Sequence, residues 1–403
     1  MSSPDTTPVI LAARRTPVGR YLGGLAPLTA PQLGGVAIRA AVESAGIPGD
    51  AVEQVIMGHV LQGGTGQAPA RQASLAAGLP VGVTALTINK VCGSGLNAML
   101  AAQAIRAGDA QVIVAGGQES MSNAPHYVRG MRGGIKLGDQ SMDDGMVHDG
   151  LYCATYHCHM GGHAEYTAGA GQVSRADQDA FAAESHRKAI AAQQGGKFAA
   201  EIVPVTLAGR KGDTIIAADE GPRADTTAES LAALRPAFAK DAPKEIGRDA
   251  LSVTAGNASS LNDGAAALVV TSEAFATAHG LPILARITGA STGAVDPRDL
   301  FFAPITAVRR LMAKQGTTIG DYGLIEANEA FASQALADGR VLGWDWDRVN
   351  VHGGAIAIGH PIGASGARVL VTLLHAMRDR DVATGFATLC LGGGDAVALG
   401  VAR

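Results

Sequence analysis

Short apolar runs alternate with Ala-rich stretches of helical composition along this chain, and this alternation limits the class of fold that it is able to adopt. The runs are rich in Val, Ile and Leu and lie at residues 9–11, 54–58, 111–116, 266–270, 323–326 and 387–390. Continuous apolar runs between helices are typical of strands that are buried on both faces of a sheet. We therefore predict an α/β protein whose sheets are covered by helices.

The length of the chain indicates more than one structural unit. Its 403 residues exceed the about 100–200 residues of an ordinary domain, so we expect two or three packed subdomains. Hydrophobic residues make up 47% of the chain, which is enough for a large core. The 54 glycines indicate tight turns and close backbone contacts, as in layered enzymes with sites built from loops.

Two segments repeat the same order of features. In residues 91–117 a turn with Gly and Ser precedes a helical stretch, and the next apolar run ends at Gly116-Gly117. In residues 361–393 the same order leads to an apolar run that ends at Gly392-Gly393. In both segments we expect the chain to turn a glycine corner after this strand. Convergence is the alternative, because βαβ units always need such corners. We favour an internal duplication, since comparable turns lie at comparable points of each half.

The segment between these halves has a different composition. Residues 122–251 carry more than half of the histidines and contain glycine-rich loop clusters. A helix is predicted over 175–194, with Ser174 as its N-cap and Asp177 near its first turn. We interpret this stretch as an inserted subdomain that lies over a functional site.

Charge and composition exclude several classes of protein. A formal net charge of −4 with 4% aromatic residues lacks the basic footprint of a nucleic-acid binder. The start has no signal-peptide pattern, no apolar run reaches the roughly 18 residues of a membrane span, and Val401-Ala402-Arg403 is not a peroxisomal signal. We expect a cytoplasmic protein without membrane contact. Four cysteines in so long a chain do not indicate a disulfide scaffold.

Cys92 is the first candidate for chemistry. It lies in Val91-Cys92-Gly93-Ser94-Gly95, and the residues after it keep helical spacing. This places it at a strand-to-helix turn, where free amides and the helix dipole favour a thiolate. Gly93 and Gly95 are expected to let a substrate carbonyl approach the backbone. The alternative is a small buried cysteine at a packed helix start.

His360 is the second candidate. It precedes Pro361 and lies between Gly359 and Gly363. Proline fixes its own φ and the glycines permit a sharp reversal, so the turn is suited to a histidine that acts as a base or an oxyanion donor. A histidine beside a proline also often has a structural role only.

Two further motifs lie at strand ends. Cys390 is followed by Gly392-Gly393-Gly394, whose exposed N–H groups are able to stabilise an oxyanion, although a cysteine there is also compatible with plain core. Asn328-Glu329 follows another apolar run and is suited to orienting water or a histidine, or to capping the next helix.

A metal site is the main competing interpretation of the histidines. Cys153, His157, Cys158, His159 and His163 lie in one short stretch and are types of residue that bind zinc. Their spacing matches no CxxC pair, and we predict no metal site.

Taken together, Cys92, the Asn328-Glu329-Ala330-Phe331 stretch, the turn at His360 and Cys390 before a triple glycine resemble the thiolase pattern in order and spacing. The resemblance covers essentially the whole chain, from Ala12 onward. It implies duplicated βαβ halves in an α/β/α/β/α core with an inserted loop domain. The resemblance implies three units. Residues 1–121 with 252–274 would form the first half and residues 275–403 the second half. Residues 122–251 would form the inserted loop domain, which serves in binding coenzyme A (CoA) and in tetramerisation.

The resemblance also implies an activity: reversible CoA-dependent cleavage of 3-ketoacyl-CoA through an acyl-cysteine. Cys92 would be the nucleophile, His360 its activator, Cys390 the second acid/base, and Asn328 the holder of a water in one oxyanion hole. The amides of Cys92 and Gly392 would form the other oxyanion hole. CoA would be a substrate, with no tightly bound cofactor. A homotetramer is implied by residues 121–134, which match the tetramerisation loop.

The residues that the resemblance assigns to binding CoA come from several segments. They are Leu151, His159, Met160, Arg223, Ser230, Leu234, Phe238, Ala255, Ser259, Ala330 and Phe331.

Three departures from the family pattern affect these expectations. Residues 240–249 are longer than in compact biosynthetic members, which affects the contacts of Phe238. Leu300-Phe301-Phe302-Ala303-Pro304 stands where many members have Met-Gly-x-Gly-Pro, and we expect the bulk of the two phenylalanines to affect the acyl pocket. Asp395 places a carboxylate close to Cys390 in sequence, although we expect it to point away.

Two other functions compete. A decarboxylating ketoacyl synthase shares the fold but lacks a second catalytic cysteine, so Cys390 argues against it. A silent acyl-CoA-binding relative would have lost a catalytic residue, and none is lost here.

Overall fold

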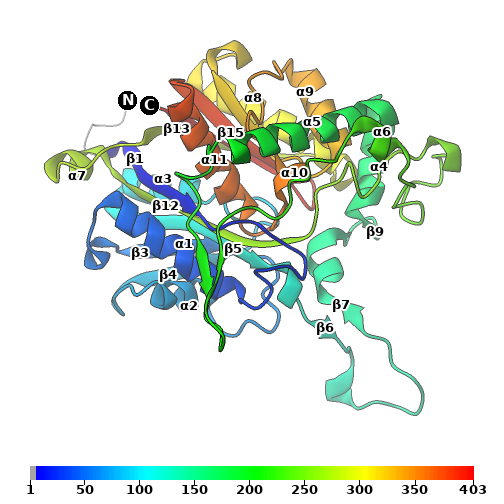
Figure 1. The fold of residues 1–403 in the computed structure, drawn as a ribbon, viewed down its shortest axis with the longest axis horizontal. Helices are drawn as coiled ribbons and strands as arrows, with labels where there is room; N and C mark the ends of the chain where they lie inside the picture. Colours follow the sequence, from blue (N-terminus) through cyan, green and yellow to red (C-terminus); the bar gives the residue numbers. More distant parts are fainter. Residues whose placement is uncertain (1–5) are drawn as a thin grey trace.

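Most strands of residues 6–403, the part of the chain that the computed structural model describes, join into one ten-stranded sheet (Figure 1). Its first half has the order β4 (Thr84–Ile88), β3 (Gln54–Gly58), β5 (Val112–Ser120), β12 (Asn262–Ser272) and β1 (Pro8–Arg15), with β2 (Gly19–Arg20) paired to β12. Its second half continues with β13 (Ala285–Ala294), β16 (Asp395–Ala402), β15 (Thr384–Leu391) and β14 (Leu324–Ala327).

The two halves repeat the same pairing pattern. In the first half β3 and β5 are parallel, and β12 lies antiparallel to both β5 and β1. In the second half β14 and β15 are parallel, and β16 lies antiparallel to both β15 and β13. The halves join through two residue pairs between β1 and β13, Val9 with Arg286 and Ile10 with Ala285. The repeated pattern confirms the prediction of duplicated βαβ halves.

Helices cover both halves and separate them. Ile105 of α3 (Ala98–Ala107) and Leu370 of α11 (Ser365–Asp379) share a core with Ile113 of β5 and Leu389 of β15, so these helices lie between the two halves of the sheet. The outer layers are α1 (Ala30–Ala45) and α2 (Pro69–Ala76) on the first half, and α8 (Ala303–Gln315) and α9 (Ala332–Leu342) on the second. The predicted α/β/α/β/α core is therefore confirmed.

The predicted glycine corner after the first repeat is wrong. Strand β5 runs through Gly116 and Gly117 to Ser120 without a turn. A Cβ on Gly116 would lie 2.2 Å from the carbonyl oxygen of Ala266, and one on Gly117 would lie 2.2 Å from that of Gly363. These glycines therefore allow close packing against β12 and the second half. In the second repeat the turn exists, and Gly393 and Gly394 both have φ +88°.

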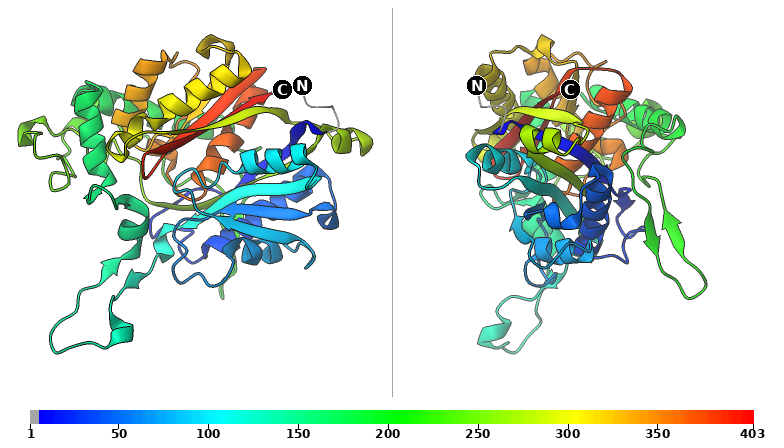
Figure 2. Two further views of the ribbon diagram at one scale, coloured as in Figure 1. Left: turned by 180° about the vertical axis from the view of Figure 1, so that it is seen from behind. Right: turned by 90° about the vertical axis from the view of Figure 1, so that its left-hand side faces the viewer.

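The segment between β5 and β12 forms separate helices and hairpins around the core. They are β6 (His126–Tyr127) with β7 (Asp143–Asp144), β8 (Tyr152–Cys153) with β9 (Cys158–His159), α4 (Met160–Ala170), α5 (Arg175–Gln194), β10 (Val205–Leu207) with β11 (Thr214–Ile216), and α6 (Ala228–Ala232). Helix α5 has the predicted bounds, and the Ser174 side chain accepts a hydrogen bond from the Asp177 amide at 3.1 Å. The arm that carries β6 and β7 projects far from the body (Figure 2).

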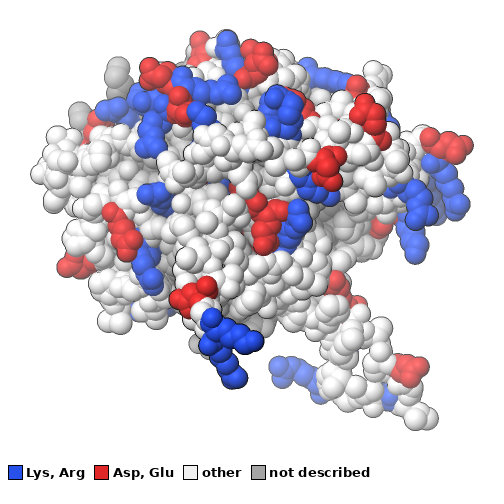
Figure 3. Space-filling model, viewed as in Figure 1, with Lys and Arg blue, Asp and Glu red and all other residues white. Residues whose placement is uncertain are grey.

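Two further short α-helices are α7 (Glu273–Ala278) and α10 (Ala355–Ile358). Within residues 6–403 no helix is long and apolar enough to cross a membrane. Acidic and basic side chains are interspersed on the face of Figure 3 and form no large basic patch there.

Candidate active site

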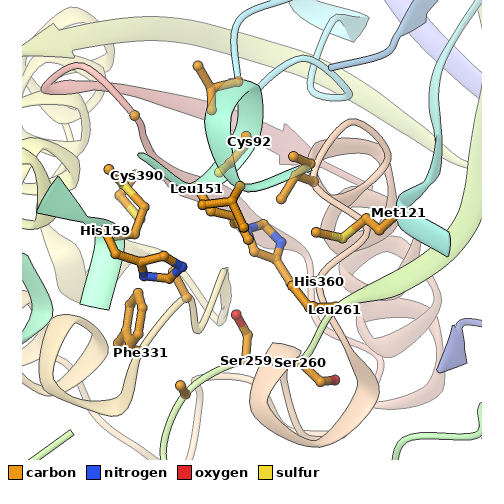
Figure 4. A pocket seen from close by; sticks show the side chains of 18 of the residues that line it. Cys92, Met121, Leu151, His159, Ser259, Ser260, Leu261, Phe331, His360 and Cys390 are labelled. Carbon is orange, nitrogen blue, oxygen red and sulfur yellow. The ribbon is translucent and has the colours of Figure 1, made fainter. Parts of the chain in front are cut away.

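A cavity of about 400 Å³ brings together most of the predicted site residues. Those that line it are Cys92, Leu151, His159, Met160, Phe238, Ala255, Ser259, Ala330, Phe331, His360, Cys390 and Gly392. The side chains of Cys92, His360 and Cys390 converge on one space, with His159 and Phe331 on the side of Cys390 and Met121 on the opposite side (Figure 4). Segments far apart in sequence thus place two thiols and one imidazole in a mostly apolar cavity.

Cys92 lies in a tight turn after β4. Val91, directly before it, has φ +45°, a left-handed conformation that is unusual for a β-branched residue and stores backbone strain. Hydrogen bonds from the Gly93 amide to the Lys90 carbonyl and from the Ser94 amide to the Val91 carbonyl hold this turn at 3.1 and 3.0 Å. Strain held by such bonds is a feature of residues placed for function.

The predicted electrostatics of Cys92 are wrong. Helix α3 begins only at Ala98, so its dipole does not act directly on the thiol. Burial raises the pKa of Cys92 to about 12, although the amides of Cys92 and Gly392 hydrogen-bond the sulfur and act in the opposite direction. The free enzyme therefore holds a neutral thiol at pH 7, and a base must accept its proton.

The expected role of Gly93 and Gly95 is also wrong, because neither lines the cavity. A Cβ on Gly93 would lie 2.4 Å from the Leu391 side chain, and one on Gly95 would lie 2.7 Å from the Ala367 backbone nitrogen. These glycines allow the Cys92 turn to pack against the second half.

His360 faces the cavity as a neutral base. Burial, and then the positive charge of Arg368, lower its pKa to about 3. Its Nδ1 lies 2.6 Å from the hydroxyl of Ser365, and its backbone amide donates to Asn262 Oδ1 at 2.9 Å. Both ends of the residue are thus held by buried polar groups, and the imidazole remains available to accept a proton.

Asn328 lies next to His360 and does not line the cavity. Its Nδ2 is 3.5 Å from Nε2 of His360, while its buried Oδ1 has no hydrogen-bond partner among residues 6–403. Buried acceptors are normally satisfied, so this oxygen is available to a water molecule beside the imidazole.

Cys390 lies near the end of β15, is 2% exposed, and faces the same cavity. Burial, and then the nearby Cys92 and Asp338, raise its pKa well above the usual thiol value. The carboxylate of Asp395 contacts the Lys90 ammonium instead of facing the cavity. Cys390 is therefore a neutral thiol able to donate a proton to substrate.

The wall beside Cys390 is aromatic. Phe331 packs edge-to-face against Phe301 and Phe238, with centroids 5.2 and 6.1 Å away. Phe238 also stacks on His159. It lines the cavity despite the greater length of residues 240–249 that follow it. Of the two added phenylalanines, Phe301 lines the cavity, whereas Phe302 packs into the core around α8.

Arg223, Ser230 and Leu234 lie outside the cavity. Arg223 lines a hollow of about 360 Å³ that also includes Arg20 and shares Ala255 with the main cavity. The Ser230 hydroxyl forms the capping box of α6 with Thr227, and Leu234 is 40% exposed. Two arginines thus lie in a hollow that adjoins the cavity.

The structure adds residues that sequence reasoning missed. Asn262 and Ser365 hold His360, and the buried Glu119 accepts from the amides of Gly363 at 2.9 Å and Val60 at 3.1 Å. A second group forms the apolar end of the cavity and consists of Met121, Met146, Leu261 and Ile362. Buried polar residues outside a motif give no local signal, although Ser365 lies in the His360 segment.

In residues 6–403 no three His, Cys, Asp or Glu side chains form a group that could hold a metal ion.

Comparison with known proteins agrees with this geometry. Residues 8–274 match the family model for the thiolase N-terminal domain, and residues 281–403 match that for the C-terminal domain. Acetyl-CoA acetyltransferase of Pseudomonas aeruginosa is 56% identical over 98% of this chain and 99% of its own, and that of Paracoccus denitrificans is 52% identical over 99% and 100%. The crystal structure of the Bacillus anthracis acetyl-CoA acetyltransferase superposes with a TM-score of 0.94 at 41% identity, covering 98% of both chains.

Proposed function

This chain belongs to the thiolase family, and we propose that it works through Cys92 as nucleophile, His360 as base and Cys390 as second acid/base. Its activity is the reversible CoA-dependent cleavage of a 3-ketoacyl-CoA into acyl-CoA and acetyl-CoA. The observation that carries the proposed roles is the convergence of these three side chains in one cavity.

Cleavage begins when His360 accepts the Cys92 proton and the sulfur attacks the 3-keto carbon. The bond between C2 and C3 then breaks, the acyl group stays on Cys92, and C2 leaves as the enolate of acetyl-CoA. Cys390 donates its proton to C2 and becomes a thiolate. Because burial raises the pKa of Cys390, its thiol is protonated before this step and readily takes a proton back.

The second half reaction returns each group to its starting state. The Cys390 thiolate accepts the thiol proton of CoA, and the CoA sulfur attacks the acyl carbon on Cys92. The Cys92 thiolate leaves and regains its proton from His360. A thiolate is both a good nucleophile and a good leaving group, so the two halves give ping-pong kinetics.

Two sets of donors are suited to the oxyanions of these steps. The amides of Cys92 and Gly392, which hydrogen-bond the Cys92 sulfur in the free enzyme, are assigned to one oxyanion. Protonated His360, with a water held by Asn328, is assigned to the other. Loss of one such donor commonly costs about 2.7–4 kcal/mol of transition-state stabilisation.

The CoA substrate is assigned to the cavity and the hollow that adjoins it. Its pantetheine arm would lie along Leu151, Met160 and Ser259, and Arg20 and Arg223 would face its phosphates. Ser230 and Leu234 would contact the nucleotide end from the α6 region. Guanidinium groups are suited to phosphate oxygens, which supports this orientation.

The arm of residues 126–144 supports a homotetramer. Exposed apolar side chains gather on it, namely Val128, Met131, Ile135, Leu137 and Met142. Such a surface is typical of a protein contact. Light scattering at micromolar concentration is expected to give four chains, and a monomer would contradict the assignment.

Three assignments complete the proposal. The inserted segment is 122–251, between a first half of 1–121 with 252–274 and a second half of 275–403. The protein acts in the cytoplasm. Both directions of the reaction use the same site, so metabolite levels set the direction of flux. The enzyme would work in fatty-acid degradation when it cleaves and in biosynthesis when it condenses.

The proposed roles are tested by following acylation and cleavage separately. Wild type and Cys390→Ala are expected to take up an acetyl group from acetyl-CoA in intact-protein mass spectra, because the CoA thiolate is a good leaving group even without a proton from Cys390. Cys92→Ala should take up none. Cleavage of acetoacetyl-CoA should fall by about 10²–10⁴-fold in Cys390→Ala.

Cys158→Ala is the matched control, since Cys158 is partly buried but does not line the cavity. It should retain both reactions. Cleavage at the wild-type rate by Cys92→Ala would refute the assignment of the nucleophile.

A further inference from the structure

His159 is held in the cavity wall with a defined tautomer. The backbone amide of Gly161 donates to its Nδ1 at 3.0 Å. A backbone amide has only a hydrogen to give, so Nδ1 carries no proton in this arrangement. Burial lowers the pKa of His159, which keeps the ring neutral at pH 7. The ring proton of the neutral imidazole therefore resides on Nε2.

A short segment after α6 fixes the position of this histidine. Asp241 Oδ1 accepts a hydrogen bond from the His159 backbone amide at 2.9 Å. The Phe238 ring stacks on the imidazole with centroids 5.0 Å apart and 19° between planes. Phe238 and Asp241 belong to one turn, in which the Asp241 amide donates to the Phe238 carbonyl at 3.0 Å.

The turn packs tightly against the start of α4. A Cβ on Gly161 would lie 2.0 Å from Cγ of Phe238, and one on Gly162 would lie 2.1 Å from the Asp241 carbonyl oxygen. No side chain larger than hydrogen fits at these two positions without displacing the turn. The aromatic ring and the carboxylate thus hold His159 from two sides.

We propose that Asp241 is a positioning residue for CoA binding, which holds the neutral His159 so that its Nε2–H donates to a carbonyl oxygen of the CoA substrate. This inference rests on the proposed function and adds to it an assigned hydrogen-bond donor and the residue that places it. A neutral donor in an apolar wall matches an amide or thioester carbonyl, whereas the phosphates of CoA are better matched by the guanidinium groups of Arg20 and Arg223.

The first experiment measures binding without turnover, so that failure of the chemistry does not affect it. Calorimetry of CoA with Cys92→Ala provides the reference Kd. The double variant Cys92→Ala/Asp241→Ala should bind CoA about 2- to 12-fold more weakly than this reference, which is the effect of losing about one neutral hydrogen bond. His159→Phe keeps a ring for stacking and should weaken binding similarly. Asp241→Asn keeps an acceptor oxygen and should restore most of the affinity.

The matched control is Asp249→Ala, which removes the same charge from an exposed position in the same segment. It should leave the Kd unchanged. In the active enzyme, Asp241→Ala should raise the KM for CoA more than it lowers kcat. The ¹⁵N shifts of His159 should show a protonated Nε2 and a bare Nδ1.

The proposal is overturned if Asp241→Ala binds CoA as tightly as its reference, even with a lower Tm, because Asp241 would then have a structural role only. A protonated Nδ1 on His159 would also overturn it. If wild type cleaves no 3-ketoacyl-CoA while CoA binding still depends on Asp241, the proposed function fails and this inference stands.

Discussion

The hydroxyl oxygen of Ser365 lies 2.6 Å from Nδ1 of His360, and Ser365 is fully buried. The hydroxyl donates to the Pro361 carbonyl at 2.9 Å, so its oxygen accepts the Nδ1 hydrogen of the imidazole and leaves Nε2 free to take a proton. The imidazole therefore keeps a partner both when it is neutral and when it has taken the Cys92 proton. A carboxylate in this place would instead favour the charged ring.

Replacing this serine should weaken the base without removing it. Ser365→Ala leaves Nδ1 of His360 buried and unpaired, which costs about 1–3 kcal/mol. We expect kcat/KM for acetoacetyl-CoA cleavage to fall by about 5- to 150-fold. The pH profile of Cys92 acylation by acetyl-CoA should change as well, because the proton acceptor is altered. Wild-type kinetics in the folded variant would show that Ser365 does not support His360.

The reactivity of Cys92 in the free enzyme should increase with pH. Its pKa is raised to about 12 and that of His360 is lowered to about 3, so neither group is charged at neutral pH. Because the thiolate is the reactive species, alkylation by iodoacetamide should rise about tenfold per pH unit between pH 7 and 10. Peptide mapping by mass spectrometry follows Cys92 separately from Cys390. A rate that is already constant above pH 7 would indicate a thiolate–imidazolium pair instead.

The contact between the two halves should tolerate no side chain at Gly117. A Cβ there would lie 2.2 Å from the Gly363 carbonyl, which is backbone and moves little. We expect Gly117→Ala to lower the free energy of unfolding by about 1–3 kcal/mol, as overpacking does. Gly133→Ala, in the exposed arm with no atom within 4 Å of an added Cβ, is the control and should leave the Tm unchanged. Equal Tm values for both variants would contradict the close packing of β5.

Phe301 should restrict the length of the acyl chain. Its ring lines the cavity and packs on Phe331 at 5.2 Å. Phe301→Leu frees space there, so kcat/KM for 3-ketohexanoyl-CoA relative to acetoacetyl-CoA should rise by about tenfold. Phe302→Leu changes the core around α8 and should leave this ratio unchanged. An unchanged ratio in Phe301→Leu would mean that the acyl chain lies elsewhere, as toward Met121 and Ile362.

Much of the fold was predictable from local pattern. Helix α5 begins and ends where Ser174 and the sequence spacing place it, because N-capping is a short-range interaction. The apolar runs that predicted β3 and β15 are strands, since burial on both faces selects continuous apolar sequence. The function of Gly116-Gly117 was not predictable, because a glycine needed for close packing has the same local signature as one needed for a turn.

The chemistry of the site was only partly accessible from sequence. The motifs identified the two thiols and the imidazole, but the predicted thiolate character of Cys92 is wrong. The pKa of a buried thiol depends mainly on desolvation, which a linear motif does not describe. Ser365 and Asn262 support His360 in the folded protein, but in the sequence they resemble many other polar residues of the chain.

Local sequence pattern is sufficient to predict the elements, the repeated halves and the candidate reactive side chains, because periodicity and turn chemistry act over a few residues. Packing of the folded chain brings the reactive side chains into one cavity and, by burial, raises the pKa of both thiols. It also brings Asp395 to Lys90 and Asp241 to His159. These properties depend on distances between residues far apart in the chain and on their exclusion from water, and both arise only when the two halves and the inserted segment pack together.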